Sequence, residues 1–218
     1  MGANLFRRHA SDMRLRRLWP WGRKTVCTNR WLPFPASPQL QTVLLGEMNC
    51  LENAVLYSEA RWREISSLPL HVIAGTIEQL QSFAGKMFRG TLRPPTSSVA
   101  VFVFTSAGQE PLNPTQRERL WRSFGVPVYE LLIDKEAGVL ASECETHEGW
   151  HVRHPQLRFE LSSGKIIFQK HGLAASPVFT GLTAGGLDGM CACGDDSPVL
   201  RNVCLQQVKQ RRARAATA

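Results

Sequence analysis

Short apolar runs alternate with stretches of amphipathic spacing through the middle of the chain. The runs at 71–74 and 99–104 predict strands, and the second is expected to be buried on both faces because it is continuous. Between them, apolar residues recur at positions that share one face of a helix. Thr76, with Gln79 three residues later, predicts a capping box that begins this helix near 77–88.

A second helix and a third strand follow. Asn113 and Pro114 are typical of the start of a helix, since asparagine caps free backbone N–H groups and proline lacks one. This helix is expected over 114–124 with Gly125 at its end, and the next apolar run predicts a strand over 126–132. Strand, helix and strand in this order favour a right-handed parallel crossover. The pattern predicts an α/β fold, a mostly parallel sheet with flanking helices.

The segments on either side of this α/β region have different patterns. Residues 40–64 place apolar side chains at near-helical spacing, which predicts a helix. After Gly138, the strand-like segments 158–161 and 165–170 are joined by Ser-Ser-Gly, which predicts a small β-hairpin. The remaining stretch to Leu200 is rich in glycine and is expected to be irregular.

The positive charge is concentrated at the two ends of the chain. The 218 residues carry a net charge of +8, but residues 1–30 hold eight basic residues and one acidic residue, and 206–218 hold four basic residues. Without these, 14 basic and 17 acidic residues remain, a balance of −3. The chain is therefore divided into a basic, poorly ordered lead-in at 1–35, a central domain at 36–205 and a basic tail at 206–218. Solvated flanks are favoured over nucleic-acid binding by these ends.

Membrane and secretory segments are not recognisable. The longest purely apolar run is Val99–Phe104, far below the roughly 20 residues that a membrane helix needs. The N-terminal arginines are not followed by the apolar stretch of a secretory signal, so a cytoplasmic location is expected. Six cysteines, at 27, 50, 144, 191, 193 and 204, lack the spacing of a disulfide framework, which favours reduced thiols or metal ligands.

A series of short motifs occurs in order between residues 106 and 194. They are Ser-Ala-Gly-Gln-Glu-Pro-Leu at 106–112, Phe-Gly-Val-Pro-Val-Tyr-Glu at 124–130, Glu-Ala-Gly at 136–138, Glu-Cys at 143–144, His-Glu-Gly-Trp at 147–150 and Cys-Ala-Cys-Gly at 191–194. In this order and spacing, roughly residues 65–205 resemble the phenylacetate–CoA ligase branch of the adenylate-forming (AMP-dependent) synthetases. The resemblance implies that the central domain is part of the large, nucleotide-binding domain of these enzymes.

The resemblance also implies an activity. Family members use ATP to convert a carboxylic acid into an acyl-adenylate and then transfer the acyl group to a thiol. The turn that lies along the adenine is matched by Gly108, Gln109, Glu110 and Pro111. ATP or AMP, Mg²⁺ and a carboxylic acid are the ligands that the resemblance implies.

Two further residues are assigned by the resemblance. Tyr129, in the motif that follows the second helix, belongs to the same nucleotide site. Glu136 matches the catalytic glutamate that helps to bind Mg²⁺ and the nucleotide phosphate. A carboxylate just beyond a parallel strand faces the crevice where α/β sheets bind ligands.

Several positions depart from the family pattern. Residues 132–135 read Leu-Ile-Asp-Lys where the family has an aromatic residue, glycine, any residue and a hydroxyl side chain. Thr180, Gly181 and Leu182 end in leucine where the family has a ribose-binding aspartate. Neither the phosphate-binding loop nor the C-terminal lid with its catalytic lysine is recognised. Because such groups supply much of the rate, adenylation is expected to be impaired or lost unless a partner chain supplies the loop and lid.

One histidine and three cysteines form a candidate metal site. Cys144 and His151 are close in sequence, and Cys191 and Cys193 follow some forty residues later. Spacing alone would leave them as unconnected thiols and a surface histidine. These elements recur in the branch that the chain resembles, which favours one closed, structural Zn²⁺ site, with His147 as a substitute ligand.

Two alternatives compete with a ligase-like function. A non-catalytic, zinc-stabilised binding or scaffold module that works with a partner enzyme fits the same residues. A nucleophile–base pair of Cys144 and His147 is disfavoured because no oxyanion-binding element is recognisable.

Overall fold

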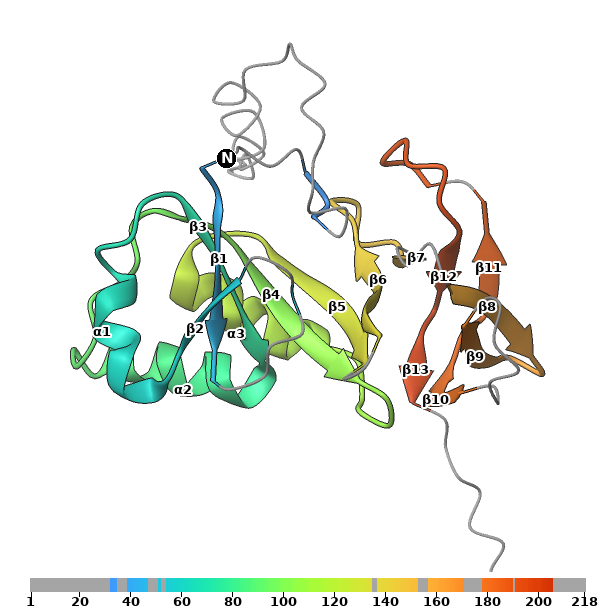
Figure 1. Ribbon diagram of the computed structural model, residues 1–218, viewed down its shortest axis with the longest axis horizontal. Helices are drawn as coiled ribbons and strands as arrows, with labels where there is room; N and C mark the ends of the chain where they lie inside the picture. The colour runs from blue at the N-terminus through green and yellow to red at the C-terminus, as the bar shows by residue number, and fades with distance from the viewer. Residues whose placement is uncertain are drawn as a thin grey trace, which may run out of the picture.

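Two β-sheets and three α-helices make up the described part of the chain. The computed structural model describes residues 32–34, 39–46, 51, 54–134, 137–152, 157–170, 178–189 and 191–205. Most of the predicted lead-in and all of the predicted tail lie outside these residues, so the three-part division of the chain stays a prediction. Figure 1 shows the helices at one end of the molecule and the smaller sheet at the other.

The larger sheet has nine strands and is parallel in one half. Its parallel half contains β1 (Gln41–Leu45), β2 (Ala54–Tyr57), β3 (His71–Thr76), β4 (Ser98–Ser106) and β5 (Val128–Asp134), in the spatial order β5-β4-β3-β1-β2. The strands β6 (Gly138–Glu143), β7 (Trp150–Val152), β12 (Val199–Arg201) and β11 (Gly186–Asp188) extend it beyond β5, each antiparallel to its neighbour. The α/β fold class and the parallel pairing of β3, β4 and β5 are confirmed.

The two longer helices form where the local sequence signals predicted them. A 3₁₀ turn η2 (Glu59–Arg61) leads into the short α1 (Trp62–Ile65), and α2 (Ile77–Phe88) and α3 (Pro114–Phe124) are longer. The predicted capping box of Thr76 with Gln79 is present, and the predicted cap Asn113 also forms a capping box, with Gln116. No helix among the described residues is long and apolar enough to cross a membrane.

Alternate residues of the parallel strands face two different cores. On β4, Val101 and Val103 pack with the buried residues of all three helices. Phe102 and Phe104 point to the opposite face, where Leu32 packs against the same strands. Burial on both faces explains why β4 reads as a continuous apolar run.

The helix predicted over 40–64 is wrong. This stretch contains β1 and β2, and only its last residues enter α1. Val43 and Leu45 face the helices while Leu44 faces the other core, so their true period is two residues. A strand buried on both faces shows no polar alternation, and its apolar positions can mimic helical spacing.

The smaller sheet has the strand order β13-β10-β9-β8. Its strands are β8 (Leu157–Ser162), β9 (Lys165–Lys170), β10 (Val178–Thr183) and β13 (Cys204–Leu205). The hairpin of β8 and β9 is confirmed, and its turn residues Ser163 and Gly164 have φ of +52° and +76°, as a tight hairpin turn requires. The stretch up to Leu200 is not irregular as predicted, because it supplies β10, β11 and β12.

The two sheets meet at a pair of glycines and at a shared core. Gly108, just after β4, donates its N–H to the carbonyl of Thr180 on β10 at 2.7 Å. A Cβ on Gly181 would lie 3.3 Å from the backbone of Gly108. Beneath this contact, Leu132 of the large sheet and Leu182 of the small sheet belong to one buried cluster.

This close approach predicts the effect of Gly181→Ala. The φ of Gly181 is +73°, where a Cβ is disfavoured, and the added methyl group would press on Gly108. We expect the free energy of unfolding to fall by about 1–2 kcal/mol, measured by chemical denaturation. Gly186→Ala is the matched control, since its Cβ would meet no atom within 4 Å. Equal free energies of unfolding for Gly181→Ala and Gly186→Ala would contradict this prediction.

Candidate functional site

The turn predicted to lie along the adenine follows β4 at the carboxyl edge of the parallel strands. The backbone N–H of Gln109 donates to the carbonyl of Ser106 at 3.0 Å, and the Gln109 side chain accepts from the N–H of Ser106 at 2.8 Å. Gly108 has a φ of +79°, a conformation that glycine adopts without strain. The turn is therefore fixed by its own hydrogen bonds and by the bond from Gly108 to β10.

A small hollow of about 230 Å³ lies beside this turn. Its walls come from β4, from the first turns of α2 and α3, and from the turn itself: Ile77, Glu78, Val103, Phe104, Thr105, Gln109, Glu110, Leu112 and Gln116. Ligands of open α/β sheets bind at this edge. The structure thus brings Gln109 and Glu110 together at a ligand-accessible edge.

The resemblance assigns two other residues to the nucleotide site. Tyr129 lies away from the 108–111 turn, and Glu136 lies outside the described residues. Tyr129 is near the start of β5, four residues before Ile133, which pairs with Ser106 at the turn. Its buried ring stacks on Phe102 and His147, and burial with nearby carboxylates raises its pKa to about 12. Glu136 lies outside the described residues, so its role stays a prediction.

The position of the expected ribose-binding aspartate is apolar and buried. Thr180 and Gly181 lie against the turn at Gly108. Leu182, the next residue, is fully buried in the core shared by the two sheets. Its side chain therefore packs the joint and offers no polar group to a ligand.

Glu130 is a buried carboxylate that the sequence analysis did not single out. It is 2% exposed, and its Oε1 accepts hydrogen bonds from the backbone N–H of Leu112 at 2.8 Å and from the hydroxyl of Thr105. The signal that could have found it is a lone charge inside the apolar run of β5. Such a charge is rare in a strand buried on both faces unless it has partners.

A second buried carboxylate and a guanidinium lie next to Glu130. Arg117 on α3 donates to Glu143 of β6 at 2.8 Å and lies 4.0 Å from Glu130. Glu143 also accepts the backbone N–H of Glu130 at 2.8 Å, and His147 is 3.5 Å away. These groups lie along a cleft of about 550 Å³ whose walls include Trp121 and Trp150.

Burial dominates the electrostatics of Glu130. It raises the pKa of Glu130 to about 7, with a further upward push from Glu143. The bonds from Thr105 and Leu112 and the charge of Arg117 act in the opposite direction and do not cancel the burial. Glu130 therefore changes its charge near neutral pH.

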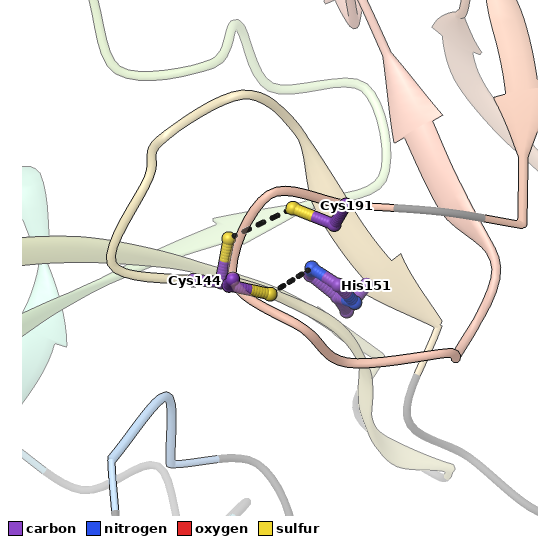
Figure 2. Close-up of side chains that lie close together, drawn as sticks. Cys144, His151 and Cys191 are labelled. Carbon is purple, nitrogen blue, oxygen red and sulfur yellow. Dashed lines mark hydrogen bonds between the residues drawn. The ribbon is translucent and has the colours of Figure 1, made fainter.

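The predicted metal ligands lie together. Cys144 follows β6, His151 is on β7, and Cys191 and Cys193 lie in the segment between β11 and β12. Their four ligand atoms are all within 4.8 Å of one another. Figure 2 shows the sulfur atoms of Cys144 and Cys191 facing each other, with the ring of His151 directed to the same place.

Two of the separations between ligand atoms are close to those expected around one tetrahedral ion. Zn–S bonds of about 2.3 Å and Zn–N bonds of about 2.0–2.1 Å place tetrahedral ligands about 3.8 Å apart for two sulfurs and about 3.5 Å apart for sulfur and nitrogen. Cys144 Sγ and Cys191 Sγ are 3.6 Å apart, and Cys193 Sγ is 3.4 Å from His151 Nε2. The donor set therefore could hold a metal ion.

The surroundings of His151 support a ligand role. The ring is fully buried, and its Nδ1 contacts the hydroxyl of Ser197 at 2.8 Å and Asp195 at 3.7 Å. Such partners fix the ring so that the other nitrogen faces the cluster, as second-layer groups do for metal-bound histidines. His147, the substitute ligand, instead stacks on Tyr129.

The thiols of the cluster differ in acidity. Burial acts to raise the pKa of Cys191, but hydrogen bonds from Cys193, Thr146 and His151 outweigh it and lower the pKa to about 6. Burial and the neighbouring thiols of Cys191 and Cys144 raise the pKa of Cys193 to about 12. The neighbouring thiols of Cys191 and Cys193 therefore do not both ionise unless a cation balances their charge.

Comparisons with known proteins identify the fold. No family model and no curated protein matches the chain. The structure is similar to 2-hydroxyisobutyryl-CoA ligase in its postadenylation state in complex with R3-HIB-AMP, with a TM-score of 0.58 and 12% identity over 78% of this chain. The same ligase in its thioesterification state, with 2-HIB-AMP and CoA, gives a TM-score of 0.56 and 12% identity over 75% of this chain.

The similarity covers part of the ligase only. The chain spans 44% and 43% of the length of these two structures. The described residues thus have the fold of part of an adenylate-forming ligase domain. The phenylacetate–CoA ligase branch, which the sequence resembles, is a finer assignment than this similarity makes.

The raised pKa of Glu130 predicts how stability depends on pH. The folded state binds the Glu130 proton more tightly than the unfolded state, so this contribution is present at low pH and is lost as pH rises toward 7. From the ordinary value of 4.5 to about 7, the loss is about 3 kcal/mol. Glu130→Gln, which cannot ionise, should lack it.

The measurement is the free energy of unfolding of the unaltered protein and of Glu130→Gln, by urea titration between pH 4.5 and pH 8. The difference between the two curves removes the contributions of other titrating groups. Glu118→Gln is the control, because Glu118 is an exposed carboxylate on α3. Parallel curves for the unaltered protein and Glu130→Gln would rule out the titration.

Proposed function

We propose that this protein is a phenylacetate–CoA ligase-like member of the adenylate-forming enzymes that binds a nucleotide weakly and is impaired in adenylation. The observation that carries the proposal is the turn at 108–111, which lies at the carboxyl edge of the parallel strands in a fold similar to part of a CoA ligase. Gln109 and Glu110 line the hollow beside it and would contact the adenine.

The residues around the turn define what each part of the site would do. The backbone of the Gly108 turn would lie along the base, as the matching turn does in the family. Glu136 would bind Mg²⁺ and the nucleotide phosphate, which the ion would help to neutralise. Leu182 leaves the ribose without a carboxylate partner at this position, and burial of its side chain supports weak binding.

A complete reaction needs groups from elsewhere. Attack of a carboxylate on the α-phosphate of ATP releases pyrophosphate and requires a cradle for the leaving phosphates. We infer that a partner chain would supply the phosphate loop and the lid if adenylation takes place. The alternative is a non-catalytic, zinc-stabilised binding or scaffold module, and the apolar position of Leu182 favours it.

Nucleotide binding and adenylation can be tested separately. Calorimetry with ATP and Mg²⁺ should give a Kd of about 1 mM, and Gln109→Ala should weaken binding by about threefold to tenfold through a lost polar contact. Glu118→Gln, outside the hollow, should leave the affinity unchanged. ATP–pyrophosphate exchange with a panel of aromatic acids should stay at background.

The outcomes separate the candidate functions. Robust exchange by the chain alone would contradict impaired adenylation and assign a full ligase. An absence of ATP binding would contradict a nucleotide-binding function and favour the scaffold module.

We also propose that Cys144, His151, Cys191 and Cys193 hold one structural Zn²⁺ in a cytoplasmic protein, where thiols stay reduced. Four protein ligands would close the coordination sphere, so the ion would not activate water. Its role would be to fasten the segment between β11 and β12 against the end of β6. Cys191 and Cys193 are only half-buried, so this segment gains little from packing alone.

Metal removal should then loosen the protein. Chelation, Cys191→Ser and Cys193→Ser should each lower Tm by about 5 °C or more, since 1 kcal/mol shifts a domain of this size by about 2–4 °C. Cys204→Ser is the matched control, because Cys204 is an exposed thiol outside the cluster. Protein purified without chelator should contain one zinc per chain by elemental analysis, and a metal-free product would end the proposal.

A further inference from the structure

We propose that Glu130 is a positioning residue that holds both ends of the 108–111 turn, and that loss of its negative charge releases the turn. The hold on the turn is a property of the chain itself. Its consequence for a ligand rests on the proposed nucleotide-binding function.

The geometry of one oxygen atom carries the proposal. Oε1 of Glu130 accepts from Thr105, which lies on β4 just before the turn, and from the N–H of Leu112, which lies just after it. Pro111 has no N–H, so Leu112 offers the first backbone donor beyond the turn. A single carboxylate oxygen therefore closes the base of the loop.

The first residue of the turn is held from another direction. Gly108 donates to Thr180 on β10 at 2.7 Å. Hydrogen bonds therefore attach the turn both to the small sheet and to the Glu130 oxygen on β5. Release of the Glu130 contacts leaves the hydrogen bond from Gly108 to Thr180 in place, so the expected change is local loosening and not unfolding.

The charges around Glu130 determine how strongly its carboxylate holds the turn at a given pH. Among the described residues, Arg117 on α3 is the cation that pairs with Glu130, at 4.0 Å, but it lies closer to Glu143 of β6, at 2.8 Å. His147, Glu118 and Glu148 line the same cleft. Glu130 is therefore incompletely balanced, and burial places its pKa at about 7.

Ionisation changes the strength of the hold. An ionised carboxylate makes charge-assisted hydrogen bonds, which are shorter and stronger than those of a neutral acid or an amide. Above neutral pH the turn should be firmly attached at Leu112, and below it the attachment should weaken. Adenine binding would follow the same dependence if the turn receives the base.

The direct test is nuclear magnetic resonance of the full chain without ligand. The amide signals of Leu112 and the turn should shift with one titration near pH 7, and this titration should vanish in Glu130→Gln. At pH 8 the protection of the Leu112 amide against hydrogen exchange should fall about tenfold in that variant. Thr105→Val, which keeps the carboxylate, should loosen residue 106 while the titration of Leu112 persists.

Glu160→Gln, which removes an exposed carboxylate of β8 outside this cleft, is the control, and the Leu112 titration and protection should persist in it. A Leu112 amide that does not titrate, or that keeps full protection in Glu130→Gln, would overturn the proposal. If Glu130→Gln does not fold, the pH titration of the unaltered chain and Thr105→Val decide the matter.

Adenosine binding separates this proposal from the proposed function. Adenosine has no phosphate, so its own charge is constant between pH 6 and pH 8. Binding that strengthens with pH in the unaltered chain, and is weak and independent of pH in Glu130→Gln, supports both proposals. A failure of adenosine to bind at any pH would contradict the nucleotide site. The amide signals of Leu112 and the turn would still test whether Glu130 holds the turn.

Discussion

One guanidinium shared between two buried carboxylates organises the centre of this molecule. Arg117 lies beside Glu130 and Glu143, which are 2% and 5% exposed. Two carboxylates this deeply buried are costly unless charge and hydrogen bonds compensate them. The compensation comes from four directions, since α3, β4, β5 and the chain just after the 108–111 turn all contribute. The position of α3 against the sheet is therefore coupled to the shape of that turn.

The same constraint reaches the candidate metal centre. Glu143 is the last residue of β6, and Cys144 follows it directly, so the strand that carries the ion pair also presents the first thiol. The turn after Cys144 carries His147, which packs on Tyr129. The segment between β11 and β12 then closes over His151 from the other side. An ion at this cluster would fasten the segment between β11 and β12 to the end of β6, whose Glu143 pairs with Arg117.

Caps and a hairpin turn were predicted correctly from the sequence, whereas a strand buried on both faces and a side-chain contact between distant residues were missed. The caps at Thr76 and Asn113 and the Ser163 turn depend on neighbours within four residues, and all three are present. Strand β1 was misread because burial on both faces removes the polar alternation that marks a strand. The metal ligands are brought together by β7 and β12, which spacing alone does not reveal. The role of Glu130 depends on Leu112, eighteen residues away, and was missed.

The joint between the two sheets shows how architecture and ligand chemistry compete for one position. Leu182 follows the glycine that touches the turn, and its side chain fills the core with Ile166 and Phe168. A carboxylate here would have to leave that core or be buried at a cost of several kcal/mol. Leucine at this position stabilises the joint and places no polar group there. The stretch 180–182 therefore joins the two sheets twice, through the backbone of Gly181 against Gly108 and through the buried side chain of Leu182.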